Sequence, residues 1–193
     1  MVKLATGLVC ATICFNAFSV ESSIKGLVDI RASVVNGADN AESYLTGDYG
    51  KFRYSDGTNF SLGQLGLHYQ LEWQNQWSVN LVGNGFADSH DIAFGLTEAY
   101  GQYKGLPTAS GWRFQSKIGV YYPQISLENI ATAWSTPYSL TSSTINNWIG
   151  EELRNTGINI KFEKLGKATK SPHSVSLELD VFQNNDSAGA MLS

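Results

Sequence analysis

Apolar residues recur at every second position along much of this chain, most regularly between residues 61 and 86. On either side of a short turn at 74–76, apolar side chains alternate with mostly polar ones. The apolar set is Leu65, Leu67, Tyr69, Leu71 and Trp73 before the turn, and Trp77, Val79 and Leu81 after it. Successive side chains of a β-strand point to opposite faces. The pattern therefore predicts an antiparallel hairpin with one apolar and one polar face.

Similar alternation marks out seven expected strands. They lie at about 24–35, twice within 61–86, and at about 92–104, 112–121, 156–163 and 175–181. The two longest connections, 36–60 and 122–151, follow the first and fifth of these strands and would lie on the same side of a sheet. Outer-membrane barrels combine short turns on one side with longer loops on the other. The sequence therefore predicts an all-β chain that forms an antiparallel transmembrane β-barrel, of which about seven strands are present.

An odd number of strands does not suit a complete barrel, since single-chain bacterial barrels normally have an even number. We therefore expect residues 20–193 to be the N-terminal part of a longer porin-like barrel, or the product of a truncated gene. The alternative is an eighth strand that the alternation does not reveal, which would close the barrel within this chain.

The first 19 residues are arranged like a secretory signal peptide. A basic start at Lys3 precedes an apolar stretch, which ends in a small-x-small cleavage pattern at 17–19. A membrane anchor or a buried helix is the alternative. Both cysteines, Cys10 and Cys14, lie in this stretch, so no thiol chemistry is expected after cleavage. We expect the mature chain in the outer membrane of a Gram-negative bacterium, in contact with its lipid.

Charge and motifs argue against several function classes. The chain carries 13 basic and 17 acidic side chains, a net charge of -4, so we do not expect a nucleic-acid partner. The histidines His68, His90 and His173 lack ligand spacing, and no catalytic motif is present. Glu151 and Glu152 could form a catalytic carboxylate pair, but a solvated loop end is the simpler interpretation. We therefore expect neither an enzyme nor a cofactor or metal.

The polar face of a barrel wall lines the lumen, whereas the apolar face meets lipid. The predicted pore-lining residues are a set of charged residues of this face together with one histidine. They are Lys25, Asp29, Arg31, His68, Glu72, Glu98, Arg113, Lys117, Lys161, Glu178 and Asp180.

The segment 122–151 is too apolar for a free surface loop and has the wrong composition for disorder. We expect it to fold against the inner wall as a constriction loop, with its apolar side chains buried there. An outer lid or a subunit contact is the alternative. The predicted residues of this loop are Gln124, Glu128, Asn129, Trp134, Asn146 and Trp148.

Four stretches carry a resemblance to a known family. They are LTEAYG at 96–101, GVYYPQISLEN at 119–129, STPY at 135–138 and INNWIGEE at 145–152. Together they resemble uncharacterised proteobacterial outer-membrane porin-like proteins, which are loosely similar to phosphate-selective porins. The resemblance implies an outer-membrane channel, often a homotrimer, but no particular solute. It also implies a chain about twice as long that ends in a terminal aromatic residue, which this sequence lacks.

The sequence leaves three functions to compare. The first is passive diffusion of small hydrophilic solutes through an outer-membrane channel, with selectivity set by pore width and wall charge. The alternative is a soluble periplasmic or secreted β-sandwich that binds glycans through exposed aromatic side chains. The third is an outer-membrane barrel enzyme, for which no nucleophile or acid–base pair is found.

Overall fold

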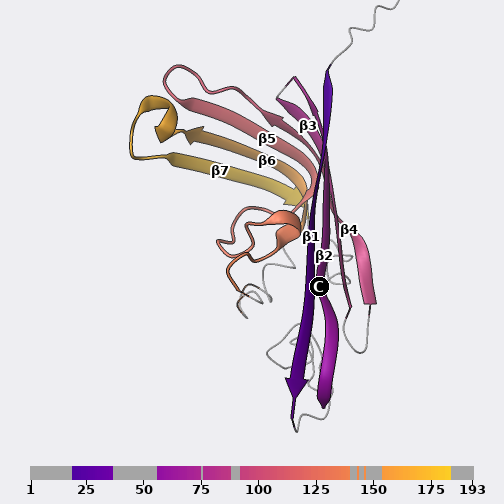
Figure 1. Ribbon diagram of the computed structural model, residues 1–193. Helices are drawn as coiled ribbons and strands as arrows, with labels where there is room; N and C mark the ends of the chain where they lie inside the picture. Colours follow the sequence, from indigo (N-terminus) through magenta and orange to yellow (C-terminus); the bar gives the residue numbers. More distant parts are fainter. Residues whose placement is uncertain are drawn as a thin grey trace, which may run out of the picture.

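The computed structural model describes residues 19–36, 56–74, 76–87, 92–139, 143, 146 and 154–183. These residues form one seven-stranded antiparallel sheet whose strands follow in chain order (Figure 1). The strands are β1 (Val20–Val35), β2 (Gly57–Trp73), β3 (Trp77–Ala87), β4 (Ile92–Lys104), β5 (Trp112–Tyr121), β6 (Asn155–Lys164) and β7 (Val175–Gln183). Two short 3-10 helices, η2 (Thr132–Trp134) and η4 (Gly166–Thr169), follow β5 and β6. The prediction of an all-β antiparallel chain is confirmed.

The predicted hairpin of β2 and β3 is confirmed in its register. Trp73 lies opposite Trp77, and the Gln76 backbone N–H donates to the Trp73 carbonyl at 3.1 Å. Gln74 takes a left-handed conformation, with φ 52°, which reverses the chain within the turn. The two tryptophans therefore end neighbouring strands on the same face.

Strand β2 begins earlier than the alternation predicted. The composition places residues 57–60 in the first long loop, but in the structure they pair with β1, for example Phe60 with Ala32 and Thr58 with Val34. The alternation also continues through them, because Asn59 is buried whereas Phe60 is exposed. The polar composition around Gly57 concealed this pairing, which depends on β1. The rest of that expected loop, up to residue 55, lies outside the described residues.

Bulges interrupt the ladder and help to curve the sheet. Gly63 is the extra residue where the register of β2 against β1 shifts, and Thr97 is the extra residue of β4 against β3. A bulge bends its strand and increases the local twist. A Cβ on Gly63 would overlap the Asp29 and Arg31 side chains, so a larger residue here would require that ion pair to shift. Figure 1 shows β5–β7 turning away from β1 and β2, with the connection after β5 inside the hollow.

The two faces of the sheet have opposite character, and apolar side chains occupy the exposed one. We call this side the outer face; large apolar side chains exposed on it include Ile24, Val28, Ile30, Val34, Phe60, Leu67, Val79, Leu81, Phe94, Leu96, Ile118, Phe162, Leu177 and Leu179. The opposite side, the inner face, buries polar side chains, including Asn59, Ser61, Ser78, Asn80, Thr97 and Asn159. Asn80 is 1% exposed, whereas Ile30 is 75% exposed. This order is the reverse of that in a water-soluble domain, where buried residues are mostly apolar.

The sheet is open in the part of the chain that the structure describes. Strands β1 and β7 are its two edges, and they pair only with β2 and β6, respectively. Within the same residues, no helix has both the length and the apolar composition needed to cross a membrane.

Candidate functional site: the inner face of the sheet

Charged side chains of β5–β7 pair across the inner face. Arg113 Nη2 lies 2.5 Å from Glu163 Oε1, and Lys161 Nζ lies 3.4 Å from Glu178 Oε2. The Asn159 amide donates to Glu178 at 2.7 Å, which gives that carboxylate a second partner. Opposite charges therefore alternate between neighbouring strands, so this part of the face has no large area of one sign.

An aromatic and acidic group borders these pairs. The Lys117 ammonium lies 5.3 Å from the centroid of the Tyr100 ring and 5.9 Å from that of Tyr121, within the range of cation–π attraction. The Tyr121 hydroxyl donates to Asp180 at 2.9 Å, and the Asn159 amide donates to the same carboxylate at 2.9 Å. Lys117 and Asp180 are thus held by neutral polar and aromatic neighbours.

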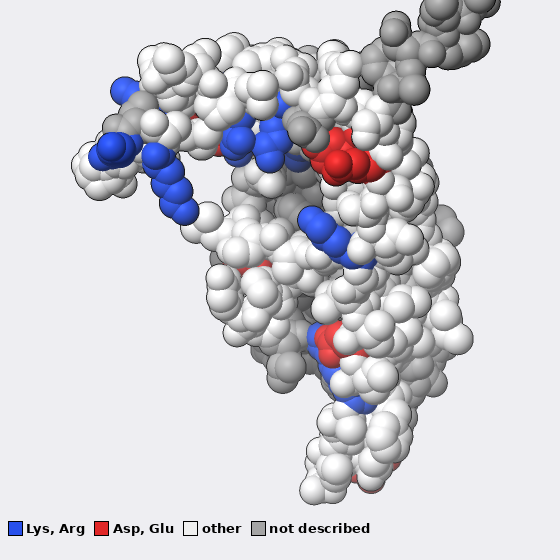
Figure 2. All heavy atoms as spheres, turned by 45° about the horizontal axis from the view of Figure 1, so that its top comes forward, with Lys and Arg blue, Asp and Glu red and all other residues white. Residues whose placement is uncertain are grey.

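Strands β1–β3 contribute a more neutral area. Lys25 lies opposite His68, and His68 Nε2 is 2.9 Å from Asn80 Oδ1. The Asn80 amide donates to the Ser78 hydroxyl at 3.0 Å, and Ser78 lies opposite Glu72. Further along β1, Arg31 Nη2 pairs with Asp29 Oδ2 at 2.5 Å. Figure 2 shows the charged side chains in separate groups along the hollowed side of the molecule, with mainly uncharged surface between them.

A backbone carbonyl of the segment after β5 is hydrogen-bonded to the inner face. The Ala133 carbonyl in η2 accepts hydrogen bonds from the side-chain amides of Gln64 at 2.7 Å and Asn84 at 3.1 Å. Ala133 is buried, and the rings of Tyr122 and Trp134 stack with centroids 4.7 Å apart. The segment therefore occupies the side of the sheet on which we expected it, with Trp134 at its point of contact.

The expected burial of the segment's apolar side chains is wrong for several of them. Ile125, Ile130 and Tyr138 are exposed, and Leu127 is 90% exposed. Polar contacts, together with Ala133, Tyr122 and Trp134, hold the described part of the segment, whereas these exposed apolar side chains do not contribute to its burial. The high apolar content of this segment therefore does not predict which of its atoms contact the sheet.

The polar residues expected in the segment have local partners. Gln124 Oε1 lies 3.4 Å from Lys161 Nζ, which connects the segment to β6. Glu128 accepts from the Ser143 backbone N–H at 2.7 Å. Asn129 accepts from the Asn146 amide at 2.6 Å. Trp148, the second expected anchor, and the pair Glu151 and Glu152 lie outside the described residues.

The contact point in η2 has a strained backbone. Ala133 and Trp134 both have positive φ, 59° and 58°. The left-handed region costs an L-residue with a Cβ about 1–2 kcal/mol. Such conformations persist where surrounding contacts hold them, and they are frequent at ligand and switch sites. The two hydrogen bonds from the Gln64 and Asn84 side-chain amides to the Ala133 carbonyl are the contacts that hold the left-handed conformation of η2.

A cavity of about 370 Å³ lies between this segment and the sheet. His68, Glu98 and Lys117 line it from the sheet, and Tyr122 and Trp134 line it from the segment. The Glu98 carboxylate accepts a long hydrogen bond, 3.4 Å, from the Tyr122 backbone N–H. Three of the predicted pore-lining residues are thus brought together by this cavity, whereas Asp29, Arg31 and Arg113 lie away from it.

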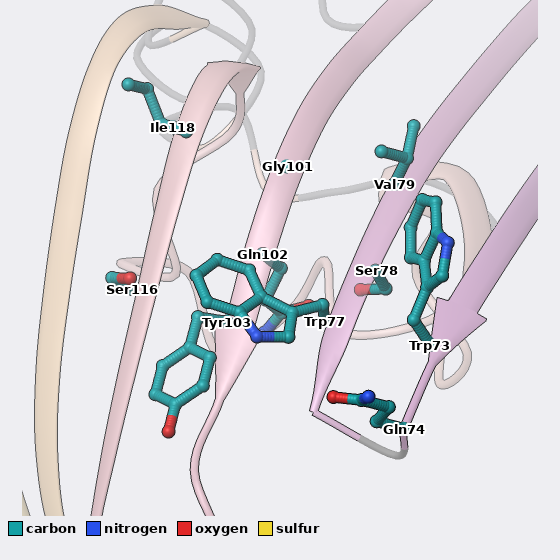
Figure 3. A pocket seen from close by; sticks show the side chains of 10 residues that line it. All are labelled: Trp73, Gln74, Trp77, Ser78, Val79, Gly101, Gln102, Tyr103, Ser116 and Ile118. Carbon is teal, nitrogen blue, oxygen red and sulfur yellow. The ribbon is translucent and has the colours of Figure 1, made fainter. Parts of the chain in front are cut away.

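The outer face carries a second, apolar hollow near the β2–β3 turn. It has a volume of about 490 Å³ and is lined by Trp73, Trp77, Val79, Tyr103 and Ile118, among others (Figure 3). The rings of Trp77 and Tyr103 lie 4.7 Å apart. Aromatic side chains clustered at one end of an apolar strip are typical of barrel residues at a membrane interface.

Sequence reasoning missed the neutral half of the inner face. Asn80, Asn159 and Gln64 are as central to its hydrogen bonds as the charged residues, yet only charge and one histidine were used to select the site. Glu163 was missed as well, although it is in phase with Lys161 two residues earlier. Period two therefore contained the signal for all four residues; selection by charge left out the three neutral ones, whereas Glu163 was omitted although it is charged.

No three His, Cys, Asp or Glu side chains among the described residues gather as a metal site would require. Comparison of the chain with models of known protein families, with curated proteins and with solved structures finds no match. The function must therefore be inferred from the chemistry of the inner and outer faces themselves.

Proposed function

We propose that this chain forms part of an outer-membrane channel for passive diffusion of small hydrophilic solutes. The observation that carries the proposal is the reversed order of the sheet, with apolar side chains exposed on the outer face and polar ones buried on the inner face. A barrel in lipid requires this order, because its outer band meets hydrocarbon and its interior meets water. The same order would be costly in water, where large exposed apolar patches promote association.

Transport through such a channel makes and breaks no bond. Solutes would pass along the inner face, and the field of its charges and the width of the lumen would select among them. The segment after β5 would reduce that width, since η2 is hydrogen-bonded to β2 and β3 on the inner side.

A soluble β-sandwich that binds glycans is supported less well. In a sandwich, a second sheet covers the apolar face of the first. The described residues form a single sheet, and its apolar face is exposed over all seven strands. The proposal in turn requires the edges β1 and β7 to be paired, because unpaired backbone groups are not tolerated in hydrocarbon. Strands outside the described residues or another copy of the chain would supply that pairing.

Two measurements test the proposal. After expression of the full-length protein in a Gram-negative host, we expect it in the outer-membrane fraction, where it resists a high-salt wash. Purified protein in liposomes should admit small sugars and exclude large ones in a swelling assay, whereas protein-free liposomes should admit neither. Release of the protein by salt, or liposomes that stay closed to every sugar, would overturn the proposal.

A further inference from the structure

The cavity between the segment after β5 and the sheet combines charged, neutral polar and aromatic groups. Glu98 and Lys117 give it one acidic and one basic side chain, while Tyr100, Tyr122 and Trp134 supply aromatic rings. Its volume, about 370 Å³, is near the lower end for small-molecule sites. It therefore has the size for a solute of one or two sugar rings.

The polar groups of the cavity have capacity for further hydrogen bonds. The Lys117 ammonium carries three N–H donors and lies near the Tyr100 and Tyr121 rings. A carboxylate has about four acceptor positions, and the Glu98 bond to the Tyr122 N–H, at 3.4 Å, is long for one of them.

Together with the strained backbone of η2, these groups form a preorganised site. Ala133 and Trp134 are held at positive φ by the amides of Gln64 and Asn84, which bind the Ala133 carbonyl. Relaxation of that strain would move Trp134, so the wall itself fixes one side of the cavity. This preorganisation lowers the entropy cost of binding a ligand.

We propose that this cavity is a saturable binding site for a neutral polyhydroxylated solute, such as a mono- or disaccharide. The inference rests on the proposed function and names the class of solute. A hydroxyl group both donates and accepts, so one such solute satisfies the Glu98 carboxylate and the Lys117 ammonium together. The C–H faces of a sugar ring pack against the aromatic side chains.

A solute with a net charge fits this cavity less well. Glu98 and Lys117 have opposite signs, so attraction by one is offset by repulsion from the other. Much of the lining is aromatic or aliphatic, and burial of an ion there costs more than burial of hydroxyl groups that find partners. A zwitterionic amino acid is the competing ligand, and its binding is one outcome of the test.

The test measures binding and permeation separately with the full-length protein. In detergent micelles, calorimetric titration with maltose and with alanine compares the two solute classes. The variants are Glu98→Gln and Trp134→Phe, and the matched controls are Glu21→Gln, a carboxylate of β1 outside the cavity, and Trp112→Phe on the outer face. Liposome swelling then reports the size limit for each variant.

We expect maltose to bind saturably and both cavity variants to weaken its binding about tenfold or more, because Glu98→Gln removes a charged hydrogen bond and Trp134→Phe removes part of the aromatic wall. The controls should stay within about twofold of the native protein. An unchanged size limit in liposomes would show that the segment is still in place in the variants. Absence of saturable maltose binding, equal weakening in the controls, or binding of alanine but not maltose would overturn the inference. If the liposomes swell but maltose does not bind, the binding inference fails and the channel proposal is supported. If maltose binds but the liposomes do not swell, only the channel proposal fails.

Discussion

At the scale of single residues, Gly66 decides how closely the segment after β5 approaches the sheet. A Cβ at this position would lie 2.6 Å from the Ala133 Cβ, which is too close for two carbon atoms. The contact is therefore available only because β2 has glycine here. Glycine serves close approach in this case, because Gly66 does not have a positive φ.

We expect Gly66→Ala to displace η2 from the wall and to raise single-channel conductance. The added methyl group would separate the Ala133 carbonyl from the Gln64 and Asn84 amides that bind it. Gly83→Ala is the matched control, because a Cβ there has no heavy atom among the described residues nearer than 3.7 Å. Planar-bilayer recording checks both, and equal conductance in the two correctly assembled variants would mean that the segment does not narrow the channel.

At the scale of elements, β2 shows how one strand serves two environments. Leu67 is exposed on the outer face, whereas the neighbouring His68 bonds to Asn80 on the inner face. The bulge at Gly63 keeps the two environments on opposite faces along the whole strand. It absorbs one extra residue, so the same face of β2 points outward before and after it.

A charge on the outer face of β2 should destabilise the membrane-embedded protein far more than one on the inner face. We expect Leu67→Arg to lower the free energy of unfolding by about 2–4 kcal/mol if the residue lies near the bilayer midplane. Gln70→Arg, which points to the inner face, should be tolerated. Urea titration of the protein in lipid vesicles measures both values, and similar losses for the two variants would contradict the assignment of the faces.

At the scale of the whole molecule, the inner face mixes charges of both signs. Arg113 and Lys161 face Glu163 and Glu178 at ion-pair distance, and Lys117 lies within cation–π range of two tyrosine rings. A strong ion filter needs a dense set of one sign. We therefore expect weak ion selectivity in the full-length channel. A reversal potential near the limit for a single ion in a salt gradient across a planar bilayer would refute this.

The two edges of the sheet make a further prediction for the molecule in lipid. If β1 and β7 are paired there, their edge amides should exchange hydrogen as slowly as those of the central strand β4. Hydrogen-exchange mass spectrometry on the full-length protein in vesicles measures this, with the protein in urea as the reference for unprotected amides. Rapid exchange confined to β1 and β7 would mean that the edges are open, and the membrane proposal would fail.

Local stereochemistry alone accounts for what could be predicted before the structure. Period two follows from the geometry of a single strand, so the positions of most strands, the β2–β3 hairpin and the two faces could be inferred from neighbours in sequence. The residues named on the inner face from this period, such as Lys161 and Asp180, are found there with polar partners. The strand start at Gly57 could not be inferred, because its evidence lies in β1.

Contacts between distant parts of the chain decided the rest. Ala133 is separated by 69 residues from Gln64 and by 49 from Asn84, and no local pattern relates an alanine carbonyl to those amides. The curvature of the sheet, the attachment of η2 and the cavity beside Trp134 all depend on such pairings. A backbone carbonyl can accept a hydrogen bond from many donors, so the sequence does not indicate its partner. The folded chain alone determines which side chains reach it.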